Sequence, residues 1–177
     1  MVTRFQSAKR TPTPPRGKEH TLALGGPSFA SGEPIPVQHT ADGQNLSPAL
    51  TWSELPRKTR SLALICEDPD APFPPFVHWL IADIPPDFGA ALPQGIAPSV
   101  MPGEVPGAIQ GRNSFGRIGY GGPEPPPGDG SHRYEFTLYA LDAPLRLREA
   151  FTKEELVAAM SGHILATGHL VGTYRRS

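Results

Sequence analysis

The chain contains the stretch Tyr134-Glu135-Phe136-Thr137-Leu138-Tyr139-Ala140-Leu141, which indicates its fold class more clearly than any other. Every second side chain in this stretch is apolar or aromatic, and those between them include a glutamate and a threonine. A period of two residues is typical of a β-strand with one buried face. Two more apolar runs of strand length, at 61–67 and 76–84, predict a fold made mainly of strands.

Proline and glycine are unusually frequent, with 23 prolines and 19 glycines in 177 residues. This content approaches that of disordered chains, but 38% of the residues are hydrophobic and the formal net charge is only −1. Disordered chains combine few apolar residues with a high net charge. We therefore expect one folded domain with many loops, in which the prolines exclude long helices.

One helix is indicated near the C-terminus. Thr152 and Glu155 have the spacing of a capping box, and Leu156, Val157 and Met160 follow at helical spacing. The pattern predicts a helix over about 153–162 and a final strand over 165–174.

The first 20 residues differ from the rest of the chain, because they are rich in proline and carry five basic residues against one acid. We predict a disordered basic leader over 1–20 and a single domain over 21–177. The domain is mildly acidic, which argues against nucleic-acid binding. No apolar stretch reaches the roughly 18 to 20 residues of a membrane span, and the N-terminus lacks a secretion signal, so we expect a cytoplasmic protein. The single cysteine, Cys66, is predicted to be a buried spectator.

Polar side chains gather where the predicted strands begin or end: Asp68, Asp70, His78 and His132. Two histidines and a carboxylate would suit a divalent metal. An aspartate, a histidine and either Ser114 or Ser131 would suit a hydrolase triad, although the chain has no Gly-x-Ser-x-Gly elbow. Histidine N–H groups and backbone amides would suit an anion. Turn-capping aspartates and core histidines would explain the same residues without any function.

Several motifs resemble the phosphatidylethanolamine-binding protein (PEBP) family, which includes the Raf kinase inhibitor proteins, and most of all its short bacterial branch. The matching motifs are Asp42-Gly43-Gln44-Asn45-Leu46-Ser47-Pro48 with Trp52 behind it, Asp68-Pro69-Asp70-Ala71-Pro72, His78-Trp79, Gly119-Tyr120-Gly121-Gly122-Pro123 through Pro125-Pro126, and His132-Arg133-Tyr134. They occur in family order and at family spacing from about residue 22 to residue 174, so residues 1–20 lie outside the resemblance.

The resemblance implies a β-sandwich with a large central antiparallel sheet, a few short peripheral helices and one small pocket for phosphate, phosphoryl head groups or acetate. The ligand-binding residues that it implies are Asp68, Asp70, Pro72, His78, Trp79, Gly122, Pro123, Pro125, Pro126, His132 and Tyr134. It implies no catalytic residue, metal or cofactor. It also implies a cis peptide bond, which Ala71-Pro72 would supply.

The function implied is that of a homodimeric binding protein for a small anion or phosphoryl head group, which could regulate a kinase or a protease. The alternative is a metal-dependent or serine-type hydrolase acting on phosphoryl or acyl groups. Strand alternation predicts that Arg133 pairs with a carboxylate on the other face from His132, and Glu124 is expected to weaken anion binding near the mouth. Packing or surface roles are expected for Tyr120, His163 and His169.

Two aspartates beside an anion favour a ligand that still carries a proton, because like charges disfavour each other. A phosphate monoanion would donate its own O–H to Asp68 and accept from the histidines. The sequence therefore predicts tighter phosphate binding near pH 6 than near pH 8.

Overall fold

A computed structural model describes residues 20–177. Its elements, in chain order, are β1 (His20–Thr21), β2 (Ala23–Gly25), the 3-10 turn η1 (Val37–His39), β3 (Leu50–Ser53), β4 (Ser61–Asp68), β5 (Phe76–Ile84), β6 (Ala91–Leu92), β7 (Ile109–Gln110), β8 (His132–Leu141), α1 (Lys153–Met160) and β9 (Ile164–Tyr174). The strands predicted at 61–67, 76–84 and 134–141 are β4, β5 and β8. The predicted leader lies outside the described residues, except that His20 already belongs to β1.

The strands form two sheets that give the predicted mainly β fold. The larger sheet has the order β1-β9-β8-β4-β5-β7, and the smaller has the order β2-β3-β6. The large sheet is mixed rather than wholly antiparallel, because β1 pairs with β9 in parallel. A parallel pair needs a long connection, and here nearly the whole domain lies between the two strands. Within residues 20–177 a single α-helix and the turn η1 take the place of the few helices expected.

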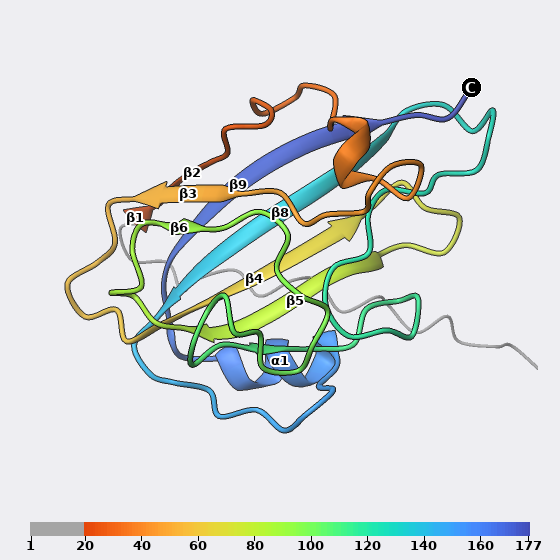
Figure 1. Ribbon diagram of the computed structural model, residues 1–177. Coiled ribbons are helices and arrows are strands. Elements are labelled where there is room, and N and C mark those ends of the chain that lie inside the picture. Colours follow the sequence, from red (N-terminus) through yellow and green to blue (C-terminus); the bar gives the residue numbers. More distant parts are fainter. Residues whose placement is uncertain (1–19) are drawn as a thin grey trace, which may run out of the picture.

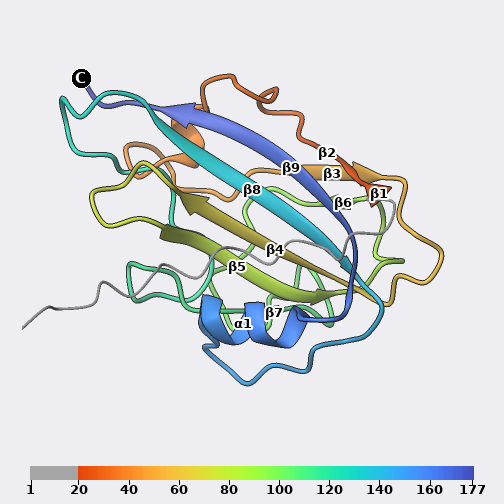
Figure 2. The same cartoon turned by 180° about the vertical axis from the view of Figure 1, so that it is seen from behind.

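Both faces of the large sheet are covered. The small sheet lies over one face (Figure 1), where Leu50 and Trp52 pack against Leu62 and its neighbours. Helix α1 lies against the other face, which Figure 2 shows from behind, and there Leu156 and Met160 join a second apolar cluster. A strand covered on both faces has no solvent side, which explains the continuous apolar run of β4.

Helix α1 begins with the predicted capping box. The Thr152 Oγ1 accepts a hydrogen bond from the backbone N–H of Glu155, and the Glu155 carboxylate accepts one from the N–H of Thr152. Lys153 follows directly and pairs with Glu67 of β4, which ties the start of the helix to the large sheet. The helix ends at Met160, two residues earlier than predicted.

A β-bulge in β5 brings His78 to the face of the small sheet. Trp79 pairs with Cys66 and Val77 pairs with Glu67, so His78 is the extra residue. A bulge lets two neighbouring side chains face the same side of a strand. His78 therefore shares the face of Trp79, although strict alternation would place them on opposite faces.

Candidate functional site

The four polar side chains of the candidate site meet at one end of the large sheet. Strand β4 ends at Asp68, β8 begins at His132, and β5 carries His78 close to its start, all at the upper right of Figure 1. Tyr134 faces the same side as His132, because the two are separated by one residue in a strand. The rings of His78 and Tyr134 lie 5.1 Å apart between centroids. Asp68, His78, His132 and Tyr134, called here the strand-end cluster, are all buried.

His132 lies between two carboxylates. Its Nδ1 is 2.8 Å from Asp68 Oδ2, and its Nε2 is 3.1 Å from Asp129 Oδ2. Burial works to lower the pKa of His132, but the hydrogen bonds to Asp68 and Asp129 outweigh it, so the pKa is raised above its usual value. An imidazolium donates through both nitrogens. The charged form of His132 therefore satisfies both carboxylates, and neither N–H is left for another acceptor.

His78 has the opposite electrostatic character. Its Nδ1 donates a hydrogen bond of 2.6 Å to the carbonyl oxygen of Gly121. Burial lowers the pKa of His78, against the opposing effect of nearby carbonyl and carboxylate groups that include Asp68. A neutral imidazole that donates from Nδ1 carries a lone pair on Nε2. His78 is thus a hydrogen-bond acceptor at neutral pH, and not the donor that the sequence predicted.

Tyr134 carries a buried hydroxyl that makes no hydrogen bond of good geometry within the described residues, although the Asp68 carboxylate lies close enough to interact with it. Burial raises the pKa of this hydroxyl, and the nearby Asp68 carboxylate raises it further. The group therefore keeps its proton and can donate. Because a buried polar group without a good hydrogen bond is costly, a ligand oxygen that accepted from Tyr134 would remove the penalty.

The carboxylate of Asp70 is engaged by Arg133, whereas its backbone N–H donates to Asp68 of the strand-end cluster. The Asp70 carboxylate accepts three hydrogen bonds of 2.9 Å from Arg133, one from the backbone N–H and two from the guanidinium. These bonds hold the pKa of Asp70 below its usual value. The prediction that Arg133 pairs with a carboxylate is confirmed. In the structure Asp70, predicted to bind ligand, joins the turn after β4 to the start of β8.

The connection from β4 to β5 contains the cis peptide bond, but at Pro74-Pro75. The expectation of a cis bond at Ala71-Pro72 is therefore wrong. Every X-Pro bond has a small trans preference, so sequence does not distinguish between neighbouring prolines. Pro72, predicted as a pocket wall, is exposed in this connection.

Gly122 forms the wall of the site through its backbone. Its N–H donates a 2.7 Å hydrogen bond to Asn45 Oδ1. A Cβ at this position would lie 2.4 Å from the carbonyl oxygen of His39, so only glycine fits. Asn45 itself has a positive φ of 58°, which asparagine tolerates better than most residues. The motif at 42–48 thus supports the wall from behind.

The other predicted wall residues differ in burial. Trp79 is fully buried, donates from Nε1 to Gln110 Oε1 at 2.8 Å and packs edge-on against Tyr120. It belongs to the core beneath the strand-end cluster. Pro123 and Pro125 are buried, whereas Pro126 is exposed.

A charged network at the C-terminal end was not anticipated from the sequence. Arg176 Nε donates to both oxygens of Asp42 at 3.0 and 2.9 Å, and Tyr174 donates to the same carboxylate at 2.8 Å. Arg176 also lies 3.8 Å from Glu124, so the negative charge of Glu124 is partly compensated. Asp129 was missed as well. No local pattern marks Arg176, because its partner Asp42 lies 134 positions away, whereas Asp129 lies only three residues before His132.

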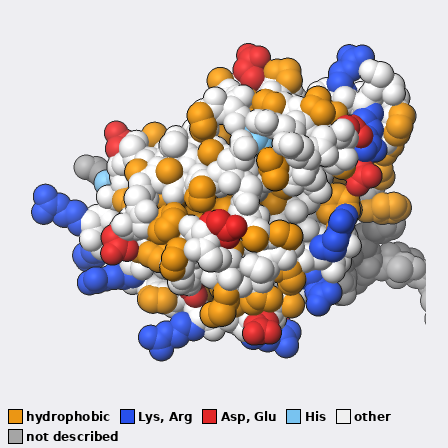
Figure 3. Space-filling view, in the orientation of Figure 1, with side chains coloured by type: hydrophobic (Ala, Val, Ile, Leu, Met, Phe, Trp, Pro, Cys, Tyr) orange, Lys and Arg blue, Asp and Glu red, His pale blue; other side chains and the backbone are white. Residues whose placement is uncertain are grey.

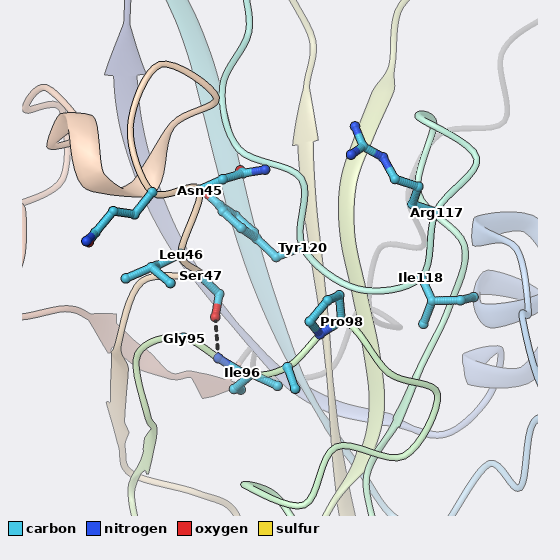
Figure 4. A pocket seen from close by; sticks show the side chains of 11 residues that line it. Asn45, Leu46, Ser47, Gly95, Ile96, Pro98, Arg117, Ile118 and Tyr120 are labelled. Carbon is cyan, nitrogen blue, oxygen red and sulfur yellow. Dashed lines mark hydrogen bonds between the residues drawn. The ribbon is translucent and has the colours of Figure 1, made fainter.

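A separate cavity of about 590 Å³ lies on the other side of the wall. It is lined by Gln44, Asn45, Leu46, Ser47, Gly95, Ile96, Ala97, Pro98, Arg117, Ile118 and Tyr120. Figure 4 shows Asn45 and Tyr120 on one side of it and Arg117 on the other. The Tyr120 hydroxyl donates to the carbonyl oxygen of His39 at 2.6 Å, and Asn45 holds Gly122, so these two groups bind protein atoms already.

The residues considered for a hydrolase triad or a metal site make other contacts. The hydroxyl of Ser114 accepts from the N–H of Val77 at 2.8 Å, and Ser131 is exposed. Among residues 20–177, neither His78 nor His132 hydrogen-bonds a serine. No group of three or more histidine, cysteine, aspartate or glutamate side chains in this part of the chain is arranged to hold a metal ion.

The remaining predictions concern packing and surface residues. Cys66 is buried as predicted, and burial raises the pKa of its thiol. Tyr120 is buried, whereas His163 pairs at the surface with Asp142 and His169 is exposed. These positions agree with the predicted packing and surface roles.

Comparisons with known proteins identify the family. The sequence profile of the phosphatidylethanolamine-binding protein family matches residues 25–175. This chain therefore belongs to that family. A UPF0098 protein of Methanothermobacter thermautotrophicus is 47% identical over 143 residues, which cover 80% of this chain and 91% of that protein.

Two solved structures share the fold. A phosphatidylethanolamine-binding protein homologue from Chlamydia trachomatis is 40% identical, with a TM-score of 0.78 over 89% of this chain and 99% of that one. YbcL of E. coli, described as a member of the mammalian PEBP family, is 31% identical, with a TM-score of 0.82 over 89% of this chain and 100% of its own.

Two further observations concern the expectations that the protein does not bind nucleic acid and does not span a membrane. In Figure 3 the lysine and arginine side chains lie scattered around the edge of the visible face and form no continuous patch there. Within the described part of the chain, no helix has the length and apolar character required to cross a membrane.

Proposed function

We propose that this protein binds a small phosphoryl anion, such as a phosphate monoester or a phosphoryl head group, at the strand-end cluster. The observation that carries the proposal is the Tyr134 hydroxyl, which is buried beside His78 and makes no hydrogen bond of good geometry among residues 20–177. An oxygen-rich ligand would supply the acceptor.

The donors and acceptors of the cluster match a phosphate that carries one proton. Tyr134 offers an O–H, and a charged His132 offers its Nε2–H if Asp129 gives way. His78 offers the lone pair of Nε2, which accepts a proton-bearing P–O–H group. Asp68 already accepts from His132 and from the N–H of Asp70. The protonated oxygen of the ligand is therefore assigned to His78 rather than to Asp68.

Binding without catalysis is part of the proposal. A serine-type hydrolase requires a histidine base within hydrogen-bonding reach of its nucleophile, and Ser114 instead accepts from the backbone of Val77. His132 has both nitrogens engaged by carboxylates, so it offers no free lone pair. These contacts favour a binding protein over the hydrolase alternative.

The test is calorimetry of phosphoethanolamine and inorganic phosphate at pH 6 and pH 8. As the pH rises, a phosphate monoester loses its second proton near pH 6, and His132 loses its charge above its usual pKa of 6.5 because its pKa is raised. Both changes weaken binding. We expect the monoester to bind about tenfold more tightly at pH 6 than at pH 8.

A matched pair of variants checks the location. His132→Ala should abolish binding, whereas His163→Ala, which breaks the surface pair with Asp142, should leave it unchanged. Binding that is tighter at pH 8, or that survives in His132→Ala, would contradict the proposal.

The remaining expectations are part of the proposal as well. They are a cytoplasmic location, a homodimer and a regulatory role toward a kinase or a protease. Native mass spectrometry of the protein from its own host would report both the subunit count and any retained ligand. A monomeric mass would contradict the homodimer.

A further inference from the structure

We propose that Asp129 competes with the ligand of the site and limits its affinity, because its carboxylate occupies the one nitrogen of His132 that a ligand could reach. This inference rests on the proposed function. A ligand must displace Asp129 from Nε2, and a phosphoryl group is better suited to do so than a simple carboxylate.

The two nitrogens of His132 are not equivalent. Nδ1 is held by Asp68, whose side chain is only 4% exposed at the end of β4 and whose other oxygen accepts the N–H of Asp70 at 2.8 Å. Nε2 is held by Asp129, whose side chain is 49% exposed in the loop before β8. The contact with Asp68 is therefore fixed by the sheet, and the contact with Asp129 faces solvent.

The backbone around Asp129 is suited to movement. Gly128 and Gly130, which flank it, have φ values of 80° and 87°, and a Cβ added at either position would meet nothing within 4 Å. Glycine rotates between backbone conformations at little steric cost. The backbone N–H of Asp129 makes a long hydrogen bond of 3.2 Å to the carbonyl oxygen of Pro126. The carboxylate can leave His132 without disturbing a strand.

Competition with Asp129 sets a cost that every ligand of His132 must exceed. An acetate ion would replace one carboxylate on His132 by another, so it gains little from the exchange. A phosphate replaces the same contact and brings further oxygens, which can accept from Tyr134 and donate to His78. The cost of displacing Asp129 is the same for both ligands. Loss of Asp129 should therefore strengthen the binding of both, and the preference for phosphoryl groups, which comes from Tyr134 and His78, should remain.

The test is calorimetry of inorganic phosphate and of acetate with the full chain. The variants are Asp129→Ala, which removes the acceptor, and Asp129→Asn, which keeps its shape but not its charge. An exposed ion pair such as Asp129–His132 is worth about two- to fivefold in an equilibrium constant, so removing it should raise ligand affinity by about that factor. We expect Asp129→Ala to bind both phosphate and acetate more tightly by about this factor, and Asp129→Asn to fall between Asp129→Ala and the wild type.

The matched control is Asp142→Asn. It removes the same charge from another aspartate that pairs with a histidine, His163, at a distance of 2.7 Å. Its phosphate and acetate affinities should equal those of the wild type. A thermal melt of each variant confirms that it is folded.

The outcomes separate this inference from the proposed function. Equal affinities in the wild type and Asp129→Ala, with binding lost in His132→Ala, overturn the role of Asp129 and leave the phosphoryl site standing. Absence of phosphate binding in all of these proteins overturns both. Histidine NMR adds a readout without ligand: the pKa of His132 should fall in Asp129→Ala, and an unchanged titration would show that the contact does not form in solution.

Discussion

Asp68 arranges the other polar groups of the strand-end cluster. One of its oxygens accepts from His132, and its charge contributes to raising the pKa of both His132 and Tyr134. The same charge opposes the effect of burial on the pKa of His78. One buried carboxylate thus favours the charged form of His132 and the protonated form of Tyr134, whereas burial keeps His78 neutral against its influence.

Tyr134→Phe should separate binding from stability. The substitution removes a buried hydroxyl that makes no hydrogen bond of good geometry in the described structure, a group whose burial costs about 1–3 kcal/mol. We expect the free energy of unfolding to rise by about 1 kcal/mol, as measured by urea denaturation. Phosphate affinity should fall about tenfold, because one charge-assisted hydrogen bond is lost.

Tyr139→Phe is the control for this substitution. Tyr139 is buried on the opposite face of β8, in the cluster that packs against α1. Its phosphate affinity should equal that of the wild type. A destabilised Tyr134→Phe protein with undiminished phosphate binding would show that the hydroxyl serves the core and not a ligand.

The elements around the site position it through two irregular features. The bulge in β5 turns His78 toward Tyr134, and the loop at 42–48 supports Gly122 through Asn45. The composition of residues 76–84 predicts a strand, but no local pattern predicts a bulge within it. The register against β4 creates the bulge, and that register depends on residues distant in sequence.

Gly122→Ala should damage the wall of the site. The new Cβ would lie 2.4 Å from the carbonyl oxygen of His39 and 2.7 Å from Asn45 Oδ1, so the two loops must separate. We expect a loss of about 1–3 kcal/mol in the free energy of unfolding and weaker phosphate binding, measured by denaturation and calorimetry. Gly103→Ala is the control, because a Cβ at that position meets nothing within 4 Å. Equal effects of the two substitutions would contradict the proposed close contact.

The whole domain is stabilised by two apolar clusters that share the large sheet. One lies beneath the small sheet and reaches the site through Tyr134, and the other lies beneath α1. The strand-end cluster occupies one end of the large sheet. Helix α1 covers the opposite face of that sheet. The apolar cluster beneath α1 therefore stabilises the domain from the face of the large sheet that the site does not use.

Leu156→Ala tests this separation. Leu156 is fully buried beneath α1, and truncating a buried leucine costs about 2–5 kcal/mol. We expect that loss in urea denaturation, with an unchanged phosphate affinity at temperatures where the variant is folded. Val157→Ala, at a half-buried position on the same helix, should cost less. A parallel loss of phosphate affinity in Leu156→Ala would mean that the two sides of the sheet are coupled.

The local sequence was sufficient to predict the main strands, the capped helix and the buried cysteine. Alternation, capping and apolar runs act between residues that are close in the chain. The family resemblance also predicted that Asp68, His78, His132 and Tyr134 lie in one pocket. For the strands, the helix and the cysteine, the information lies within a few residues of the position it describes.

Tertiary structure was needed to assign the partners. Asp70 lies 63 positions from Arg133, and Arg176 lies 134 positions from Asp42. Local sequence carries no signal for such pairs, because the register of the large sheet and the course of the loops decide which side chains meet. The same holds for His132, which was predicted to donate to an anion. The fold places it between Asp68, which lies 64 positions away, and Asp129, so a ligand can reach it only by displacing a carboxylate.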